Sequence, residues 1–340
     1  MAELSPRALM SLLFNGAKAV DVLETALDLG LLDDLEPGPV RLRELADRHG
    51  LKPLRLYKFL DCLETLGVVH RIDGGDDLAE TSYRAVPGLR EATVAALGPN
   101  AIERDRDRYP WRVLHGRLAD SLRGDVSMTD DDFAWPPKTD EQTASFERSM
   151  SVGLGPVIEV FHRYASRLWA GRRRFLDVGG GAGTLAASVL ADAPELRADV
   201  YNLAAVGPLV EQTRAGCVDP GRLGFVPGDF LRQPLPAGYD TMAFVRVLHD
   251  WPTETARELV EAAYRALEPG GQLVICEEFR TPDRLAVQFF WSYFLIGVDS
   301  CVSRLREVSF YTALLEKTGF ENVEVLSGEW ELVVAAKPVS

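Results

Sequence analysis

The sequence predicts an α/β protein in which a doubly wound parallel sheet follows a mainly helical domain. The chain has 340 residues, enough for two domains with ample cores. In its second half, short apolar strands alternate with helices through short connections, which is typical of a parallel sheet. Two strands at 323–326 and 332–336 share a short loop and form a terminal antiparallel hairpin. The stretch RRFLDVGGGAGTLAASVL at 173–190 has the pattern of a strand, a glycine turn and a helix start.

Composition narrows the class of protein. With 46% hydrophobic and 26% charged residues the chain is ordinary for a soluble globular protein. Its net charge of -14 disfavours nucleic-acid binding, which needs a basic surface. Lys18, Asp21 and Glu24 interrupt the N-terminal apolar run, so neither a signal peptide nor a membrane span is expected. The four scattered cysteines have no metal-ligand spacing, as expected of reduced thiols in a cytoplasmic protein without a metal.

Residues 1–105 are predicted to form a winged-helix-like domain. A helix over 9–32 is apolar on most sides and suits a subunit interface. Two further helices and two strands are expected at 42–48, 53–66, 68–72 and 78–83. A winged helix can bind DNA, and its second helix carries Lys52, Arg55 and Lys58, but its wing is acidic. Dimerisation and scaffolding are therefore the favoured role.

Residues 106–170 are predicted to link the domains and to contribute to a substrate pocket. Helices are expected over 143–150 and 151–169, the second beginning late because of an early Gly and Pro. Phe146 and Met150 lie one helical turn apart, where they either line a pocket or belong to the core.

Residues 171–340 are predicted to form the cofactor-binding domain. Its parallel strands are expected at 175–178, 199–203, 224–226, 240–247 and 272–276, with helices at 184–190, 208–215, 253–267 and 307–318. Residues 268–271 are expected to be a turn that ends the third of these helices.

The glycine turn has two possible ligands. Asp177, Gly179, Gly181 and Gly183 form D-x-G-x-G-x-G, in which glycine allows a sharp turn and a close ligand. Its last two glycines with Ala186 also fit the NAD fingerprint. The acidic Asp177 repels a pyrophosphate, however, and it suits a nucleoside that carries the positive charge of a sulfonium. A second acidic strand end, Asp229, suits adenine or ribose. With the terminal hairpin, these carboxylates favour S-adenosylmethionine.

Five segments carry a family resemblance: FLDVGGGAG, PGDF, VLHDWP, LEPGGQLVICEE and FYTALLEKTGF. Together with the helical N-terminal half, they resemble the two-domain small-molecule O-methyltransferases of the caffeate/flavonoid and bacterial polyketide type. The resemblance covers nearly the whole chain. It implies a class I methyltransferase fold, a homodimer, S-adenosyl-L-methionine as cofactor, and a small aromatic or polyketide-like acceptor from secondary metabolism such as antibiotic biosynthesis. The cofactor-binding residues would be Asp177, Gly179, Gly181, Gly183, Asn202, Asp229 and Phe230.

The resemblance assigns His249 as the general base and Glu277 as the residue that orients it. Methyl transfer is an in-line displacement, to which a positioned base contributes about 10²–10⁴-fold. A histidine with its usual pKa of about 6.5 accepts a proton near neutral pH. A packing role for His249 and a solvated strand-end role for Glu277 are the alternatives.

Two positions depart from the family pattern. Asn202 replaces an aspartate that holds the ribose hydroxyls, at an expected loss of about 1 kcal/mol. Arg304 replaces a glutamate. It would lower the pKa of His249, or bind a carboxylate or phosphate of the substrate.

An aromatic segment at 283–301 is expected to form a pocket wall, because aromatic side chains suit a flat, conjugated acceptor. Among its closely spaced aromatic residues, Phe290, Tyr293 and Phe294 are the substrate candidates. Core or dimer packing is the alternative for some of them.

Other functions remain open on these residues. The fold could hold the cofactor for a decarboxylation, hydroxylation or cyclisation, which the two departures motivate. The acceptor atom could be nitrogen or carbon. A DNA-binding regulator is disfavoured by the acidic wing.

Overall fold

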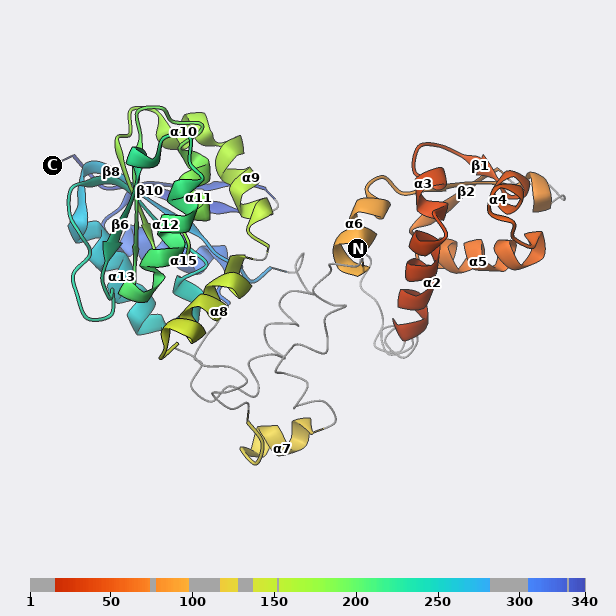
Figure 1. Cartoon of the computed structure of the whole chain (residues 1–340), viewed down its shortest axis with the longest axis horizontal. Coiled ribbons are helices and arrows are strands. Elements are labelled where there is room, and N and C mark those ends of the chain that lie inside the picture. Colours follow the sequence, from red (N-terminus) through yellow and green to blue (C-terminus); the bar gives the residue numbers. More distant parts are fainter. Residues whose placement is uncertain are drawn as a thin grey trace. The chain divides into compact units, whose positions relative to one another are not determined.

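The computed structural model describes residues 16–73, 78–97, 117–127, 137–151, 153–281, 305–328 and 330–339. The chain divides into two compact units, residues 1–112 and 113–340, and each is described by itself. Figure 1 labels the elements of both.

The N-terminal unit places helices around a small sheet. Its elements are α2 (Gly16–Asp28), α3 (Leu31–Leu35), β1 (Val40–Arg41), α4 (Leu42–His49), α5 (Pro53–Thr65), β2 (Val69–Asp73), η1 (Leu78–Glu80), β3 (Ser82–Ala85) and α6 (Leu89–Leu97). The strands are antiparallel in the order β1-β3-β2. The predicted helices at 42–48 and 53–66 are present as α4 and α5. The winged-helix and dimerisation assignments stay predictions.

Three features of this unit differ from the sequence prediction. The predicted helix over 9–32 is interrupted within its described part, because Gly30 adopts a left-handed φ of 72° between α2 and α3. The predicted strand over 78–83 begins only at Ser82, since Leu78–Glu80 form a 3₁₀ turn. The short strand β1 was not predicted, because two residues carry no periodic signal.

The described residues between the small sheet's unit and the large sheet include the helices α7 (Leu118–Arg123), α8 (Asp140–Ser151), α9 (Gly155–Arg163) and α10 (Ala165–Trp169). The predicted long helix over 151–169 is therefore two helices, which begin late as expected. They separate at Tyr164, whose φ of -103° is not helical. The inner face of α9 buries Val157, Val160 and Phe161 against the sheet.

The C-terminal unit contains a seven-stranded sheet in the order β6-β5-β4-β7-β8-β10-β9. Its strands are β4 (Arg174–Val178), β5 (Arg197–Asn202), β6 (Leu223–Pro227), β7 (Tyr239–Val245), β8 (Leu267–Cys276), β9 (Glu321–Leu326) and β10 (Leu332–Ala336). Strands β4 to β8 pair in parallel, whereas β10 is antiparallel to both β8 and β9. The predicted fold class, with its terminal hairpin, is confirmed.

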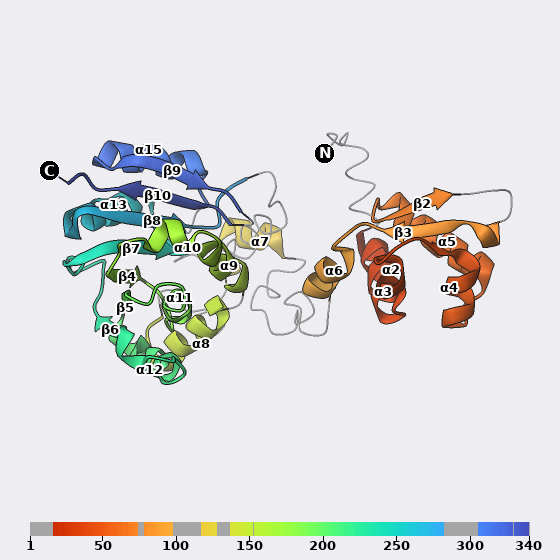
Figure 2. The same ribbon diagram turned by 90° about the horizontal axis from the view of Figure 1, so that it is seen from above.

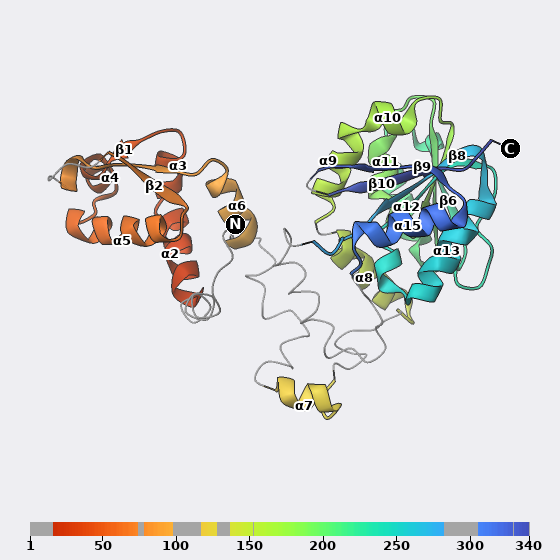
Figure 3. The same ribbon diagram turned by 180° about the vertical axis from the view of Figure 1, so that it is seen from behind.

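Helices cover both faces of this sheet (Figures 2 and 3). The connecting elements are α11 (Thr184–Val189), η4 (Ala204–Val206), α12 (Gly207–Ala215), η5 (Pro220–Arg222), η6 (Leu248–Asp250), α13 (Thr253–Ala266) and α15 (Val308–Thr318). Successive side chains of a strand point to opposite faces. In β4, Phe175 accordingly packs with α9 to α12, while Leu176 and Val178 pack with α13 and α15. Burial on both faces goes with an apolar sequence from Phe175 to Val178 that only Asp177 interrupts, after the exposed first residue Arg174.

The predicted turn at 268–271 belongs to the span of β8. Leu267 already pairs with Tyr239, and the next pair joins Gln272 to Thr241. The intervening residues therefore form an irregularity in the strand, where Gly270 takes a φ of 75°.

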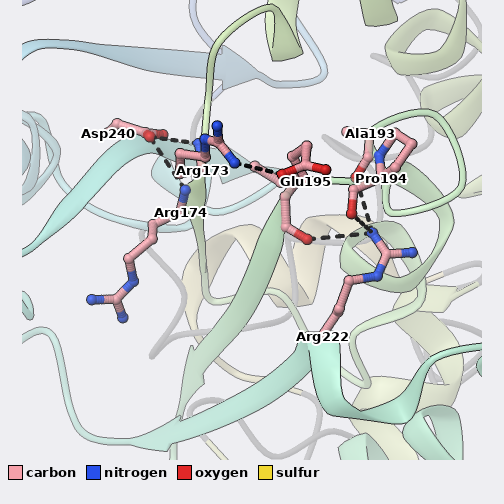
Figure 4. Close-up of polar contacts among 8 residues, drawn as sticks. Arg173, Arg174, Ala193, Pro194, Glu195, Arg222 and Asp240 are labelled. Carbon is pink, nitrogen blue, oxygen red and sulfur yellow. Dashed lines mark hydrogen bonds and ion pairs between the residues drawn. The ribbon is translucent and has the colours of Figure 1, made fainter.

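Arginine residues form hydrogen bonds and an ion pair near the amino ends of the strands (Figure 4). This edge of the sheet is opposite the glycine turn. The backbone N–H of Arg173 donates to Asp240 Oδ2 at 2.6 Å, and its guanidinium contacts Glu195 at 2.6 Å. The guanidinium of Arg222 donates to the carbonyl oxygens of Ala193 and Leu190 at 2.9 and 3.0 Å. These contacts hold the strand starts in register.

Candidate active site

A cavity of about 430 Å³ lies at the carboxyl ends of β4, β5 and β7, beside α8. Ligands of doubly wound sheets bind at this edge. The sequence candidates that line it are Asp177, Gly179, Gly181, Asn202, Asp229, Phe230, Phe146 and Met150. Gly183 instead lies behind the wall, at the N-cap of α11. Strand ends and one helix thus bring together residues far apart in the chain.

Close packing explains the glycines of the turn. Gly179, Gly181 and Gly183 have φ values of 74°, 54° and 80°, which L side chains rarely adopt. A Cβ on Gly179 would lie 2.8 Å from Val247 Cγ2, and one on Gly181 would lie 2.6 Å from Glu147 Oε2. The turn therefore leaves backbone atoms exposed to a ligand without intervening side chains.

Asp177 is the buried acidic group beneath this turn. Its side chain is 1% exposed, and neither carboxylate oxygen has a hydrogen-bond partner among the described residues. Burial, together with the nearby Glu147, raises the pKa of Asp177 to about 7. A buried carboxyl that borders a cavity in this state requires a ligand with hydrogen-bond donors or positive charge. S-adenosylmethionine supplies both, so the site fits it, whereas a pyrophosphate would be repelled.

Asn202 directs its amide toward a second carboxyl group. Its Oδ1 accepts the backbone N–H of Leu203 at 2.8 Å, and its Nδ2 donates to Glu147 Oε1 at 3.5 Å. Burial raises the pKa of Glu147 to about 7, while the hydrogen bond from Asn202 and the charge of Arg246 act in the opposite direction. Sequence reasoning missed Glu147. Its signal was a charged residue beside Phe146 on the helix already suspected of lining a pocket.

Asp229 and Phe230 form another part of the wall. Asp229 Oδ1 accepts the backbone N–H of Leu231 at 2.9 Å, which fixes the turn after β6. The ring of Phe230 packs edge-on against Trp251 with 5.8 Å between ring centroids. An acidic group beside an aromatic wall is suited to a nucleoside.

His249 and Glu277 are paired in the interior. One oxygen of Glu277 accepts the backbone N–H groups of Val247 and Leu248 at 3.0 and 2.7 Å, and the other contacts His249 Nδ1. Glu277 is 1% exposed and His249 is 3% exposed. The carboxylate of Glu277 therefore contacts both the turn that carries His249 and the imidazole ring itself.

The charge state of His249 differs from the sequence expectation of an ordinary pKa. Burial lowers its pKa, but the carboxylates of Asp250 and Glu277 outweigh burial and raise it to about 9. Asp250 Oδ1 lies 3.4 Å from Nε2 of the ring. His249 does not itself line the cavity within the described residues, whereas its neighbours Val247, Asp250 and Trp251 do.

Arg306 fixes both ends of this turn. Its guanidinium donates to the carbonyl oxygens of Leu248 and Trp251 at 3.0 and 2.6 Å, although these residues are more than 50 positions away. It is 3% exposed and stacks over Phe310. Sequence reasoning considered only Arg304 here, since no local pattern distinguishes the two arginines.

Arg246 is a further residue of the cavity that sequence reasoning missed. Its φ of 55° is left-handed, and its backbone N–H donates to Cys276 O at 2.8 Å. Burial lowers the pKa of its guanidinium, and nearby Cys276, Glu277, Glu278 and Asp250 oppose this change. A strained arginine at a strand end is a recurrent feature of functional sites.

Several predicted site residues lie outside the described residues: Phe290, Tyr293, Phe294 and Arg304. Within the described ranges, no group of three or more His, Cys, Asp or Glu residues is arranged to hold a metal ion. In the same ranges, no helix combines the length and apolar character needed to cross a membrane.

Comparisons with known proteins agree with this geometry. A family model described as an O-methyltransferase domain matches residues 135–321. The chain is 30% identical to N,N-dimethyltransferase OxyT of Streptomyces rimosus, over 96% of this chain and 94% of that protein. It is 27% identical to the tetracenomycin polyketide synthesis 8-O-methyl transferase TcmO of Streptomyces glaucescens, over 97% and 95%.

Among solved structures, the S-adenosylmethionine-dependent methyltransferase SibL in its apo form superposes with a TM-score of 0.68. The alignment covers 97% of this chain and 99% of that chain at 24% identity, so the likeness concerns the fold.

Proposed function

The chain belongs to the family of S-adenosylmethionine-dependent O-methyltransferases, and from this premise we propose that it methylates a hydroxyl of an aromatic, polyketide-type compound with His249 as base. The observation that carries the proposal is the buried contact between His249 Nδ1 and Glu277 beside the cavity. The named relative TcmO acts in polyketide synthesis, which supports the choice of acceptor class.

The bound cofactor supplies an electrophilic methyl group on a sulfonium. Asp177, Asn202, Asp229 and Phe230 are the residues proposed to hold it, since they line one cavity. Holding the two reactants in line contributes as much as about 7–11 kcal/mol to such a reaction. The glycine turn 179–183 is proposed to bring the protein backbone close to the ligand.

His249 is proposed to receive the hydroxyl proton on Nε2. Glu277 holds Nδ1, so Nε2, which lies 3.4 Å from Asp250 Oδ1, is the nitrogen proposed to face the acceptor. The carboxylate also stabilises the imidazolium that forms. Since Asp250 and Glu277 raise the pKa of His249, the ring is a strong proton acceptor that is largely protonated at neutral pH in the ligand-free protein.

Phe146 and Met150 are proposed to contact the acceptor from α8, because both line the cavity that holds the glycine turn. The aromatic residues of 283–301 and Arg304 keep their proposed substrate role from the sequence. A homodimer formed through residues 1–105, a linker and pocket segment at 106–170, and a cytoplasmic location complete the proposal.

N-methylation is the second candidate, and the name of OxyT, an N,N-dimethyltransferase, favours it. The same base can take a proton from an ammonium or an amine. A non-methylating reaction on this fold predicts product formation without S-adenosylhomocysteine.

Two measurements test the proposal. Calorimetric titration with S-adenosylmethionine and S-adenosylhomocysteine should give micromolar binding of both. Incubation with matched hydroxy- and amino-aromatics should then form S-adenosylhomocysteine together with a methyl ether. Binding followed by exclusive methylation of the amine would favour the second candidate. Absence of binding would contradict the cofactor assignment.

A further inference from the structure

The cavity contains a carboxylate that no strand end supplies. Glu147 projects from α8, with Oε1 at 3.5 Å from Asn202 Nδ2 and Oε2 so close to Gly181 that a Cβ there would lie 2.6 Å away. Both neighbours are themselves cavity residues. Glu147 thus lies between the glycine turn and the end of β5, deep in the proposed cofactor site.

Asn202 offers a ligand only a neutral acceptor that is already partly used. Its one side-chain acceptor atom, Oδ1, gives one of its two lone pairs to the backbone N–H of Leu203 at 2.8 Å. Its amide group is a donor and points to Glu147. A ligand hydroxyl that approaches this corner of the cavity therefore finds its strongest acceptor on Glu147.

We propose that Glu147 is the ribose-binding carboxylate of this enzyme, supplied by helix α8 in place of the acidic side chain that β5 lacks at position 202. This inference rests on the proposed function, since it assigns a residue within the same cofactor site. Asn202 becomes a positioning residue, whose amide holds the carboxylate toward the ligand. The cis-diol of the nucleoside is the chemical group recognised.

A purely structural role for Glu147 is opposed by its surroundings. The carboxyl is largely buried, which raises its own pKa, and its charge also raises the pKa of Asp177. Arg246 is the cation that offsets this charge, and Asn202 is the hydrogen-bond donor. Two acidic groups that border one cavity destabilise the ligand-free fold, as expected where a site is adapted to a ligand.

The test is a set of binding titrations that need no methyl acceptor. Glu147→Gln keeps the shape and removes the charge. The substitution should weaken the binding of S-adenosylhomocysteine about 10- to 100-fold, because a charged hydrogen-bond acceptor is lost. The affinity for the nucleoside 5′-methylthioadenosine, which has the ribose but no amino acid, should fall by the same factor. Glu141→Gln, the same change at an exposed position of α8, should leave both affinities unchanged.

The carboxylate can also be moved. The double variant Glu147→Gln with Asn202→Asp puts the amide on α8 and the carboxylate at the end of β5. It should restore most of the lost affinity for both ligands. Glu147→Gln alone should raise the melting temperature of the ligand-free protein, because a buried charge is removed.

Three outcomes would overturn the inference. Weaker binding of S-adenosylhomocysteine with unchanged 5′-methylthioadenosine would place the carboxylate at the amino-acid end of the ligand. Unchanged binding of both would remove Glu147 from the site. A lower melting temperature with no rescue by Asn202→Asp would make it a structural residue. If wild-type protein bound neither ligand, the proposed function itself would be wrong.

Discussion

Glu277 contacts the Nδ1 atom of His249 with one carboxylate oxygen and secures the preceding backbone with the other. The two residues are 28 positions apart and come from the ends of neighbouring parallel strands, β7 and β8. A strand end thus supplies the turn that carries the histidine, and the next strand supplies the group that orients it.

The first prediction concerns this pair. His249→Ala should lower turnover by about 10²–10⁴ while cofactor affinity stays nearly unchanged, because the ring lies behind the cavity wall. Glu277→Gln should also lower kcat, since an amide stabilises the imidazolium less well. Steady-state kinetics and calorimetry on both variants provide the measurement. Retained turnover of an ordinary phenol by His249→Ala would exclude it as the base.

The second prediction is a pH profile. Because His249 must be neutral to accept a proton and its pKa is raised to about 9, kcat/KM should rise with pH well beyond 6.5. The positive charge of a bound sulfonium lowers the midpoint, yet it should stay above the ordinary histidine value. Asp250→Asn removes one of the two carboxylates that raise this pKa, so the midpoint should move to lower pH. A midpoint at or below 6.5 in the wild type would contradict the charge arrangement.

The third prediction links stability to the site. The folded state raises the pKa of Asp177 from 3.8 to about 7, so the folded protein binds the proton more tightly than the unfolded chain. The free energy of unfolding of the ligand-free protein should therefore fall as pH rises from about 4 through 7. Asp177→Asn should remove much of this fall and raise the melting temperature at pH 8, yet abolish cofactor binding.

Thermal unfolding at several pH values tests that sign directly. Asp125→Asn is a suitable control, because this exposed carboxylate lies outside the cavity. Lower stability of Asp177→Asn at pH 8 would show that the carboxylate is paired rather than strained.

The fourth prediction concerns the guanidinium of Arg306, which donates hydrogen bonds to two carbonyl oxygens. Arg306→Gln should lower the free energy of unfolding by about 1.5–3 kcal/mol, because it removes charged hydrogen bonds to the carbonyls of Leu248 and Trp251. It should also lower kcat, since the turn that carries His249 loses the two hydrogen bonds that hold it in place. Arg280→Gln, at an exposed position, should change the free energy of unfolding by no more than about 0.5 kcal/mol and should leave kcat unchanged. Equal effects of the two changes would contradict this role.

The sequence was most informative where a local pattern ends at a strand terminus. Apolar runs bounded by glycine and acidic residues placed β4, β5, β6 and β7 within a few residues. Parallel strands bring their carboxyl ends to one edge, so Asp177, Asn202 and Asp229 could be grouped before any coordinates existed. The same logic failed where regularity is interrupted. Gly30 and Tyr164 each divide a periodic apolar pattern into two helices.

By itself, the sequence predicted the doubly wound sheet and the cofactor from short patterns at strand ends, and its family resemblance implied the class I methyltransferase fold and the candidate pair of His249 and Glu277. Only the tertiary structure decided what surrounds these groups. Glu147 and Arg306 reach the site from 55 and 58 residues away in the chain, and no local pattern shows which distant residues they contact. The raised pKa values of Asp177 and His249 likewise arise from burial and from the distance to other charges, which are properties of the packed chain alone.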